Sequence, residues 1–378
     1  MQQFRENIEN NDFKACFFAM NTKGQYHETM EYIYDIALAY EKAGIETYLI
    51  HEETDYKMPE WLGEEYTNLT HYSFEDFSGK ITLSASDYIF VPEAYTELLS
   101  QLVEHKVPAE IVMIIQHYEM VFDALELGDS YSTSYGVKNV IVPSNAIKNH
   151  LSQYMHGLNF HVLNPYVKDV FEQNDKPKKP IVLMADSSSR ASERIVKKFY
   201  TKYPQYSWVP FKMLSRFHIN DIKDQYQEAP CVIFLDDKNS FCIEQLQAMS
   251  MGVVPISATP KLAPDWLIED GKLKNLGVYT NNDLKIVDLI AYFIDAFITD
   301  RVEEDIITLA KQTASVYNLK RYQEQFSLIF ENLKQSRLDL FNRIEQKQKE
   351  NKLQKVENYY QLPTHKDGMG LKENLNED

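Results

Sequence analysis

The chain has few cysteines and no long hydrophobic run. Its 378 residues include three cysteines, Cys16, Cys231 and Cys242, an odd number without close pairing. This argues against a disulfide framework and against a zinc site, and it favours a reducing compartment. No stretch approaches the roughly 18 consecutive apolar residues of a membrane span, and residues 1–15 are polar. We therefore expect a cytoplasmic protein without a transmembrane segment.

Positive charge is also scarce. Lys and Arg number 39 against 56 Asp and Glu, which gives a net charge of −17. Non-specific binding to nucleic acid or to an anionic membrane requires clustered Lys and Arg side chains, so the composition disfavours both. It does not exclude a local basic groove. The chain contains neither a G-x-G-x-x-G loop nor a G-K-[ST] loop, which argues against a nicotinamide dehydrogenase and a P-loop ATPase.

What the chain does contain is an alternation of strand and helix patterns. Residues 13–20 form an apolar run typical of a buried strand, a helical pattern follows, and residues 46–51 predict the next strand. Such units build parallel, doubly wound sheets. Further strands are predicted at 87–93, 110–118, 139–144 and 159–165, and in the second half at 180–185, 206–211 and 232–235.

A charged segment with prolines interrupts this alternation and predicts two domains. We expect an α/β protein with two Rossmann-like domains facing a cleft and a helical C-terminal extension. The predicted parts are residues 1–168, a linker at 169–180, residues 181–320, and residues 321–378 as a C-terminal helix, able to cross back to the first domain, followed by a disordered tail.

The stretch 232–259 is the most informative one, because it predicts a strand, a polar loop, a helix and a second strand. A helix N-terminus at the carboxyl edge of a parallel sheet favours a phosphate-bearing ligand. Asn239 and Gln247 are eight residues apart, so both amides can face such a ligand and bind ribose or sugar hydroxyls. Alternatively, Asp237 or Asn239 caps the helix and residues 248–251 are core.

Two further loops contain candidate ligand-binding or catalytic residues. Ser188 and Arg190 follow the first strand of the second half and can donate to a diphosphate; the alternative is a serine cap with Arg190 in solvent. In the first half, His117 or Glu119 can orient or deprotonate an acceptor hydroxyl, although a histidine at a strand end is commonly structural. Lesser candidates are His27 as a base, Asp236 with Asp237 as a metal pair, and Tyr26, Tyr118 and Tyr135 for stacking.

The segment NSFCIEQLQAMSMGVVPISAT at 239–259 resembles the donor-site signature of GT-B glycosyltransferases of family 4. In that signature two Glu residues, separated by seven others, precede a run matched here by Ala248, Met249, Gly252 and Pro255. The two Glu positions fall on Asn239 and Gln247. A turn at Pro264, Asp265 and Trp266, with the segments 21–25 and 59–66, is similar to a group of bacterial glycosyltransferases.

The resemblance implies a GT-B transferase. Its second domain would bind a UDP- or GDP-sugar and its first domain a hydroxyl acceptor, a polysaccharide or glycoconjugate, with retention and without a cofactor or a required metal. Glu244, one turn before Gln247, can replace the missing ribose carboxylate. Arg190 and the Ser240 helix N-terminus would neutralise the diphosphate, and Gly24, Asp237 and Phe241 complete the expected donor site.

Two alternatives remain open at this point. The acceptor can instead be a hydroxymethylated base in phage DNA, which the acidic composition disfavours. The protein can also be a catalytically silent GT-B scaffold, because amides stand where the signature has two carboxylates. An amide still donates and accepts hydrogen bonds but carries no charge.

Overall fold

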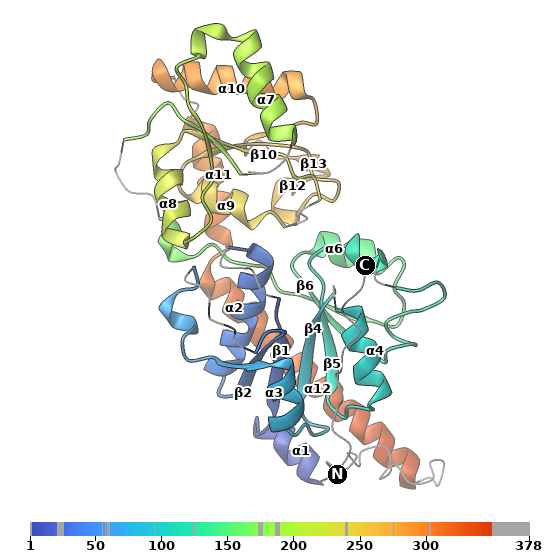
Figure 1. Cartoon of the computed structure of the whole chain (residues 1–378). Helices are drawn as coiled ribbons and strands as arrows, with labels where there is room; N and C mark the ends of the chain where they lie inside the picture. The colour runs from blue at the N-terminus through green and yellow to red at the C-terminus, as the bar shows by residue number, and fades with distance from the viewer. Residues whose placement is uncertain are drawn as a thin grey trace, which may run out of the picture.

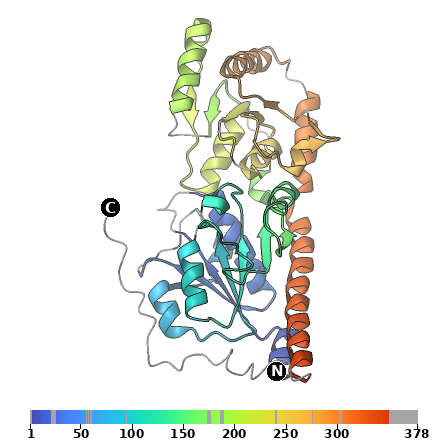
Figure 2. The same ribbon diagram turned by 90° about the vertical axis from the view of Figure 1, so that its right-hand side faces the viewer.

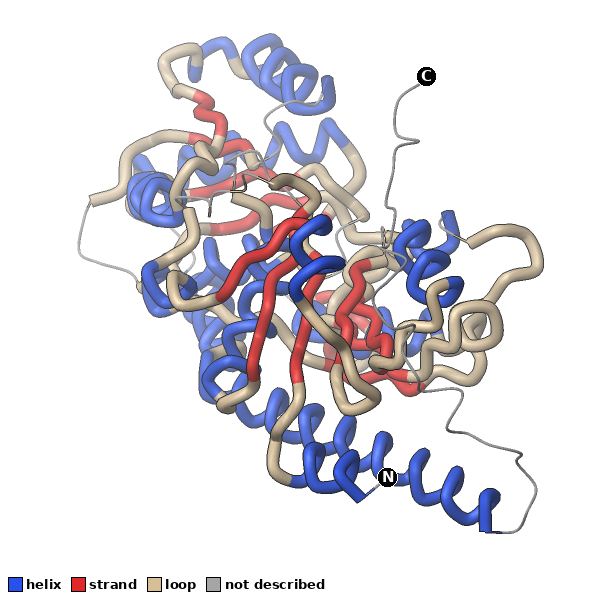
Figure 3. Tube along the Cα trace, turned by 60° about the horizontal axis from the view of Figure 1, so that its bottom comes forward, coloured by secondary structure: helices blue, strands red, loops and turns tan. Residues whose placement is uncertain are grey.

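The computed structural model describes residues 2–20, 26–54, 56, 58, 61–93, 95–123, 125–172, 177–185, 190–238, 241–274, 276–301 and 304–349. The chain forms two lobes, one above the other in Figure 1. Each lobe is built on a parallel sheet with helices around it (Figure 3). Within the described residues, no helix is both long and apolar enough to cross a membrane.

The first lobe contains a seven-stranded sheet of order β3-β2-β1-β4-β5-β6-β7, in which all neighbouring strands are parallel. The order reverses between β1 and β4, and doubly wound sheets bind ligands at the carboxyl edge beside such a reversal. The elements are α1 Gln2–Glu9, β1 Lys14–Phe18, α2 Glu28–Lys42, β2 Glu46–His51, η1 Glu64–Tyr66, β3 Thr70–Ser73, α3 Phe74–Lys80, β4 Tyr88–Pro92, α4 Thr96–Glu104, β5 Glu110–Ile114, α5 Met120–Asp123, β6 Asn139–Val142, α6 Asn145–Leu151, β7 Asn159–Val162 and η2 Asp169–Phe171.

The second lobe contains a five-stranded parallel sheet of order β9-β8-β10-β11-β14, which reverses between β8 and β10. A short hairpin of β12 and β13 follows β11. The elements are β8 Val182–Met184, α7 Arg190–Lys202, η3 Pro204–Tyr206, β9 Phe211–Met213, α8 Ile219–Glu228, β10 Cys231–Phe234, α9 Ile243–Ser250, β11 Val254–Ser257, η4 Asp265–Leu267, β12 Ile268–Glu269, β13 Lys272–Leu273, β14 Val278–Tyr279, α10 Asp283–Ile298, α11 Glu304–Val316 and α12 Leu319–Lys349.

The sequence prediction misplaced one strand of this sheet. The strand predicted at 206–211 lies at Phe211–Met213, so the prediction ends where β9 begins. Pro204 opens a 3-10 turn that ends at Tyr206, where the strand was predicted to begin, and Tyr206 stacks on Phe199 with ring centroids 6.0 Å apart. Tyr206 and Phe211 of the predicted strand thus pack on Phe199 of α7, whereas Trp208 is exposed. β3 was not predicted, because its residues THYS lack an apolar run.

The last two helices connect the lobes. α11 packs on α9 in the second lobe, whereas α12 packs on α1, α2 and β7 in the first. In Figure 2 the two helices form one column along both lobes. The chain thus crosses between the lobes twice, and the crossings meet where Val167 N donates to Tyr317 O at 2.7 Å. Arg337 anchors α12 in the first lobe by an ion pair of 3.2 Å with Glu110.

The Pro264–Trp266 turn also connects the lobes. The carboxylate of Asp265 accepts hydrogen bonds from the backbone N–H of Asn145 at 2.8 Å and of Ala146 at 3.0 Å, the first two residues of α6 in the first lobe. A carboxylate at a helix N-terminus satisfies orphan donors and complements the helix dipole. Trp266 Nε1 donates to Phe241 O at 2.7 Å and so fixes the loop that enters α9.

Candidate functional site

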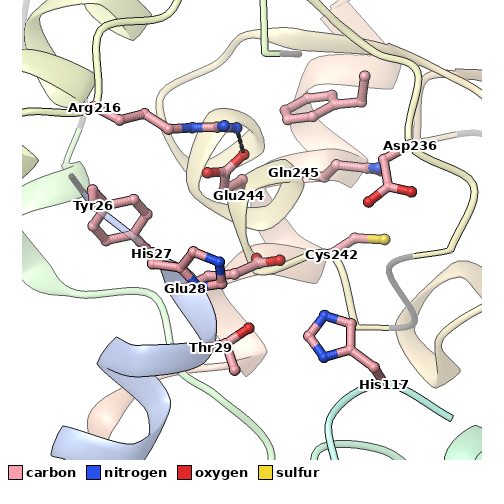
Figure 4. A pocket seen from close by; sticks show the side chains of 11 residues that line it. Tyr26, His27, Glu28, Thr29, His117, Arg216, Asp236, Cys242, Glu244 and Gln245 are labelled. Carbon is pink, nitrogen blue, oxygen red and sulfur yellow. Dashed lines mark hydrogen bonds and ion pairs between the residues drawn. The ribbon is translucent and has the colours of Figure 1, made fainter. Parts of the chain in front are cut away.

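A polar pocket of about 190 Å³ lies between the lobes, at the carboxyl edges of both sheets (Figure 4). Its first-lobe wall consists of residues 26–29, at the start of α2, and His117, which follows β5. The second-lobe wall consists of Arg216 after β9, residues that end or follow β10, and the first turn of α9. Facing carboxyl edges of parallel sheets are where this class of fold holds ligands.

His117 is held from behind by a buried carboxylate. Glu93 follows β4 and is 2% exposed, and its Oε1 lies 3.0 Å from His117 Nδ1. Burial lowers the pKa of His117, but the hydrogen bond and charge of Glu93, with smaller contributions from Glu28 and Asp236, raise it above its ordinary value. The imidazole lines the pocket with its other edge (Figure 4), so it can exchange a hydrogen bond or a proton with a ligand.

The start of α2 forms the floor beside His117. Gln116 Nε2 donates to Thr29 O at 3.0 Å and ties this helix to the loop after β5. Burial lowers the pKa of His27, and the charges of His117 and Arg216 lower it further. The pKa of His27 is therefore shifted downward and that of His117 upward, so His27 is the histidine of the pocket that favours the neutral form.

The second-lobe wall holds a close ion pair. Arg216 Nη2 lies 2.6 Å from Glu244 Oε2, and the two side chains are 30% and 12% exposed (Figure 4). Arg216 is the only lysine or arginine among the described residues that line the pocket. Glu28, Asp236 and Glu244 bring three carboxylates to the same lining. Oxygen acceptors and imidazoles of this kind suit a hydroxyl-rich ligand, and Arg216 is the group suited to an anion.

The described residues contain no group of three or more His, Cys, Asp or Glu side chains arranged to hold a metal ion. Of the acidic pair after β10, Asp236 lines the pocket and its Oδ1 accepts from Lys238 N at 2.9 Å. Asp237 does not line it; its backbone oxygen accepts from Lys261 N at 2.9 Å.

No protein-family model and no curated protein sequence matches the chain. Among solved structures, it is similar to a glycosyltransferase from Rickettsia africae, with 13% identity and a TM-score of 0.59 over 85% of this chain and 98% of that one. The chain is also similar to the sucrose-phosphate synthase of Thermosynechococcus elongatus, with 11% identity and a TM-score of 0.58 over 85% of this chain and 98% of that one. A third similar structure is Anabaena HepE in complex with UDP-glucose, with 12% identity and a TM-score of 0.58 over 84% of this chain and 99% of that one.

The chain has the GT-B fold. The fold class expected from the sequence is thereby confirmed, whereas membership of family 4 within the GT-B fold stays a prediction. The carboxyl edges that face each other across the pocket are the two Rossmann-like edges of this fold.

One of the two signature positions does not face the GT-B pocket. Gln247 is fully buried; its Nε2 donates to Tyr26 Oη at 3.3 Å, and its Oε1 has no hydrogen-bond partner among the described residues. α9 begins at Ile243, so Glu244 in its first turn reaches the pocket whereas Gln247, one turn later, lies against the first lobe. The expectation that Gln247 faces a ligand at the helix N-terminus is not met.

Arg190 also lies away from the pocket. It is exposed at the first turn of α7 and lines a groove between α7 and α10 with Arg194 and Lys197. Positions 190, 194 and 197 share one face of a helix, and that face is directed along α10 rather than into the GT-B cleft. The structure does not bring Arg190 to the pocket that Arg216 lines.

Other candidates have structural partners. Glu119 bridges the lobes, 3.4 Å from Lys261 Nζ and 3.9 Å from Lys238 Nζ. Phe241 is 5% exposed and packs edge-on against Tyr317. Of the tyrosines expected to stack on a ligand, Tyr26 and Tyr118 are buried and Tyr135 is half-buried beside Asp129. Gly24, Ser188, Asn239 and Ser240 lie outside the described residues.

Sequence reasoning missed Glu28, Glu93 and Arg216. Glu93 was placed at the end of the predicted strand 87–93, but β4 ends at Pro92, so Glu93 is a polar residue that directly follows a parallel strand, at the carboxyl edge that borders the cleft. Arg216 follows β9 by three residues, but the misplaced strand prediction at 206–211 hid this position. Glu28 is the first residue of α2 and directly follows His27, which was the candidate predicted in this segment.

Proposed function

We propose that the protein is a glycosyltransferase that moves a sugar from a nucleotide-diphosphate-sugar to a hydroxyl acceptor. The observation that carries this proposal is the polar pocket between the two carboxyl edges of a GT-B fold. HepE, which was solved with UDP-glucose, shares this fold over 84% of the present chain. In the reaction, the bond from the sugar to the diphosphate breaks, a bond to the acceptor oxygen forms, and the acceptor proton leaves on the diphosphate.

The pocket offers a group for each part of such a reaction. Arg216 is suited to the diphosphate and, with the N-terminus of α9, to the charge that develops on it. Glu244 is suited to ribose or sugar hydroxyls once it releases Arg216. On the first lobe, His117 is suited to a hydroxyl of the sugar or of the acceptor.

The finer points of the proposal come from the sequence resemblance. They are retention of configuration, a UDP- or GDP-sugar donor, an acceptor that is a polysaccharide or glycoconjugate, no required metal and a cytoplasmic location. Transfer to a base in phage DNA is the less favoured acceptor, because the net charge of −17 opposes approach to a polyanion.

A catalytically silent GT-B scaffold is the second candidate, and one observation favours it. Glu244 neutralises Arg216, and Glu28 and Asp236 leave the described pocket lining rich in carboxylates. A diphosphate entering this pocket must displace Glu244 or approach three carboxylates, which costs binding free energy.

Thermal unfolding with UDP, GDP, UDP-glucose and GDP-mannose separates the two candidates. An enzyme is stabilised by at least one of them, by about 2.7 kcal/mol at a ligand concentration a hundredfold above Kd. Arg216→Ala should remove the stabilisation, whereas Arg194→Ala, on the exposed face of α7, should keep it. If none of the nucleotides raises the unfolding temperature of the wild-type protein, the scaffold is the better account.

A further inference from the structure

Glu93 is a buried carboxylate beside the pocket whose role the proposed reaction leaves open. Strands β4 and β5 pair in register up to Pro92 and Ile114, and Glu93 N donates to Ile114 O at 3.2 Å. This pairing brings the Glu93 side chain over the end of β5. Its Oε1 accepts from the backbone N–H of Gln116 at 3.1 Å and of His117 at 2.7 Å.

The same oxygen is 3.0 Å from His117 Nδ1. A carboxylate oxygen that already receives two N–H groups is an acceptor, so the ring nitrogen facing it must carry a proton. The neutral imidazole then has its proton on Nδ1 and its lone pair on Nε2. Because Glu93 is 2% exposed and absent from the pocket lining, it fixes the ring without occupying ligand space.

The groups around His117 belong to three further elements. Glu28 and His27 come from the start of α2, and Asp236 follows β10; Arg216 follows β9 on the opposite wall. The carboxylates of Glu28 and Asp236 raise the pKa of His117, whereas the charges of His117 and Arg216 lower the pKa of His27. Glu93 is the group in direct hydrogen-bond contact, so its removal should have the largest effect on the titration of His117.

We infer that Glu93 is a positioning residue that holds His117 in the Nδ1–H tautomer, with Nε2 free to accept a hydrogen bond from a sugar or acceptor hydroxyl. The identity of that hydroxyl rests on the proposed function. The tautomer of His117 and the effect of Glu93 on its titration do not, because both follow from the contact between Glu93 and the ring.

A purely structural role for Glu93 makes a different prediction. The two backbone N–H contacts tie the loop after β5 to β4, and Glu93→Gln can keep both through its amide oxygen. That substitution removes only the charge. A loop anchor therefore tolerates it without any change at His117, whereas a positioning residue does not.

The test is a long-range proton–nitrogen NMR titration of histidine-labelled protein, with the His117 signal assigned through His117→Gln. We expect the Nδ1–H tautomer in the neutral wild-type ring and a lower titration midpoint of His117 in Glu93→Gln. Exposed His105 and His156 are internal references whose midpoints should stay constant. A wild-type Nε2–H tautomer, or an unchanged His117 midpoint in Glu93→Gln, would overturn the inference.

A kinetic measurement distinguishes failure of this inference from failure of the proposed function. With UDP-glucose as the probe, Glu93→Gln should lower kcat more than it changes KM and displace the pH profile. The matched control Glu126→Gln, at an exposed carboxylate, should do neither. If the wild type neither cleaves nor transfers the sugar of UDP-glucose or of GDP-mannose, the proposed function fails, and the NMR titration still decides the role of Glu93.

Discussion

The two walls of the pocket each pair a basic side chain with a carboxylate, but they do so in opposite ways. In the first lobe, Glu93 lies behind His117, outside the pocket lining, and leaves the far edge of the ring open. In the second lobe, Glu244 lies inside the pocket with Arg216 and uses one of its donors. A partner placed behind a basic group orients it, whereas a partner placed in front neutralises it until a ligand takes its place.

His117→Ala breaks the first-lobe pair and should have the largest effect on activity. Loss of a positioned acid–base group lowers kcat by about 10² to 10⁴. Hydrolysis or transfer of UDP-glucose at saturating concentration measures it, and the exposed His156→Ala is the control. A kcat within twofold of the wild type would remove His117 from the reaction.

Gln247→Glu should reduce stability rather than restore donor binding. The new carboxylate would be fully buried beside Tyr26, which already donates to Glu31. An uncompensated buried charge costs about 3 to 5 kcal/mol, which urea unfolding measures. Burial raises the folded-state pKa of the new carboxyl group, so the loss should develop as pH rises above about 4 and vanish below it.

The exposed Gln153→Glu should change stability little and is the matched control for this substitution. If Gln247→Glu binds UDP or GDP more tightly at unchanged stability, the position reaches the ribose after all. The signature-based interpretation would then be correct for this residue.

Glu244→Gln tests the second-lobe pair with a smaller expected effect. Removing the charge frees Arg216, and the Gln amide can still hydrogen-bond ribose hydroxyls, so UDP should bind about tenfold more tightly, a change of ~1.4 kcal/mol. Titration calorimetry measures it, with Glu193→Gln on the exposed face of α7 as the control. Weaker binding would show that the Glu244 carboxylate itself binds the ribose hydroxyls.

Arg190→Ala should have the smallest effect, because its side chain lines the groove of α7 and α10 and not the pocket. We expect UDP affinity within about twofold of the wild type, as for surface substitutions remote from a site. Side-by-side calorimetry of Arg190→Ala and Arg216→Ala is the measurement. A loss of UDP affinity of several orders of magnitude in Arg190→Ala would show that Arg190 binds the diphosphate.

Local sequence patterns predicted much of the fold because buried parallel strands and their helices carry short-range signals. The apolar runs at β1, β4 and β10 mark strands buried on both faces, and the turn at Gly44 closes α2. Prediction failed at β9, because Tyr206 lies in a segment with the composition of a strand but packs on α7. It also failed at β3, a polar strand recognisable only by its pairing with β2.

The sequence by itself determined two parallel sheets, the helix after β10 with its N-terminus at a carboxyl edge, and His117 at another edge. Each of these features follows from patterns among residues that are close together in the sequence. Only the tertiary structure decided that Glu93 stands behind His117, that Arg216 rather than Arg190 meets Glu244, and that Gln247 lies against Tyr26. Those contacts join residues from 24 to 221 positions apart, so they depend on strand order and on how the lobes face each other.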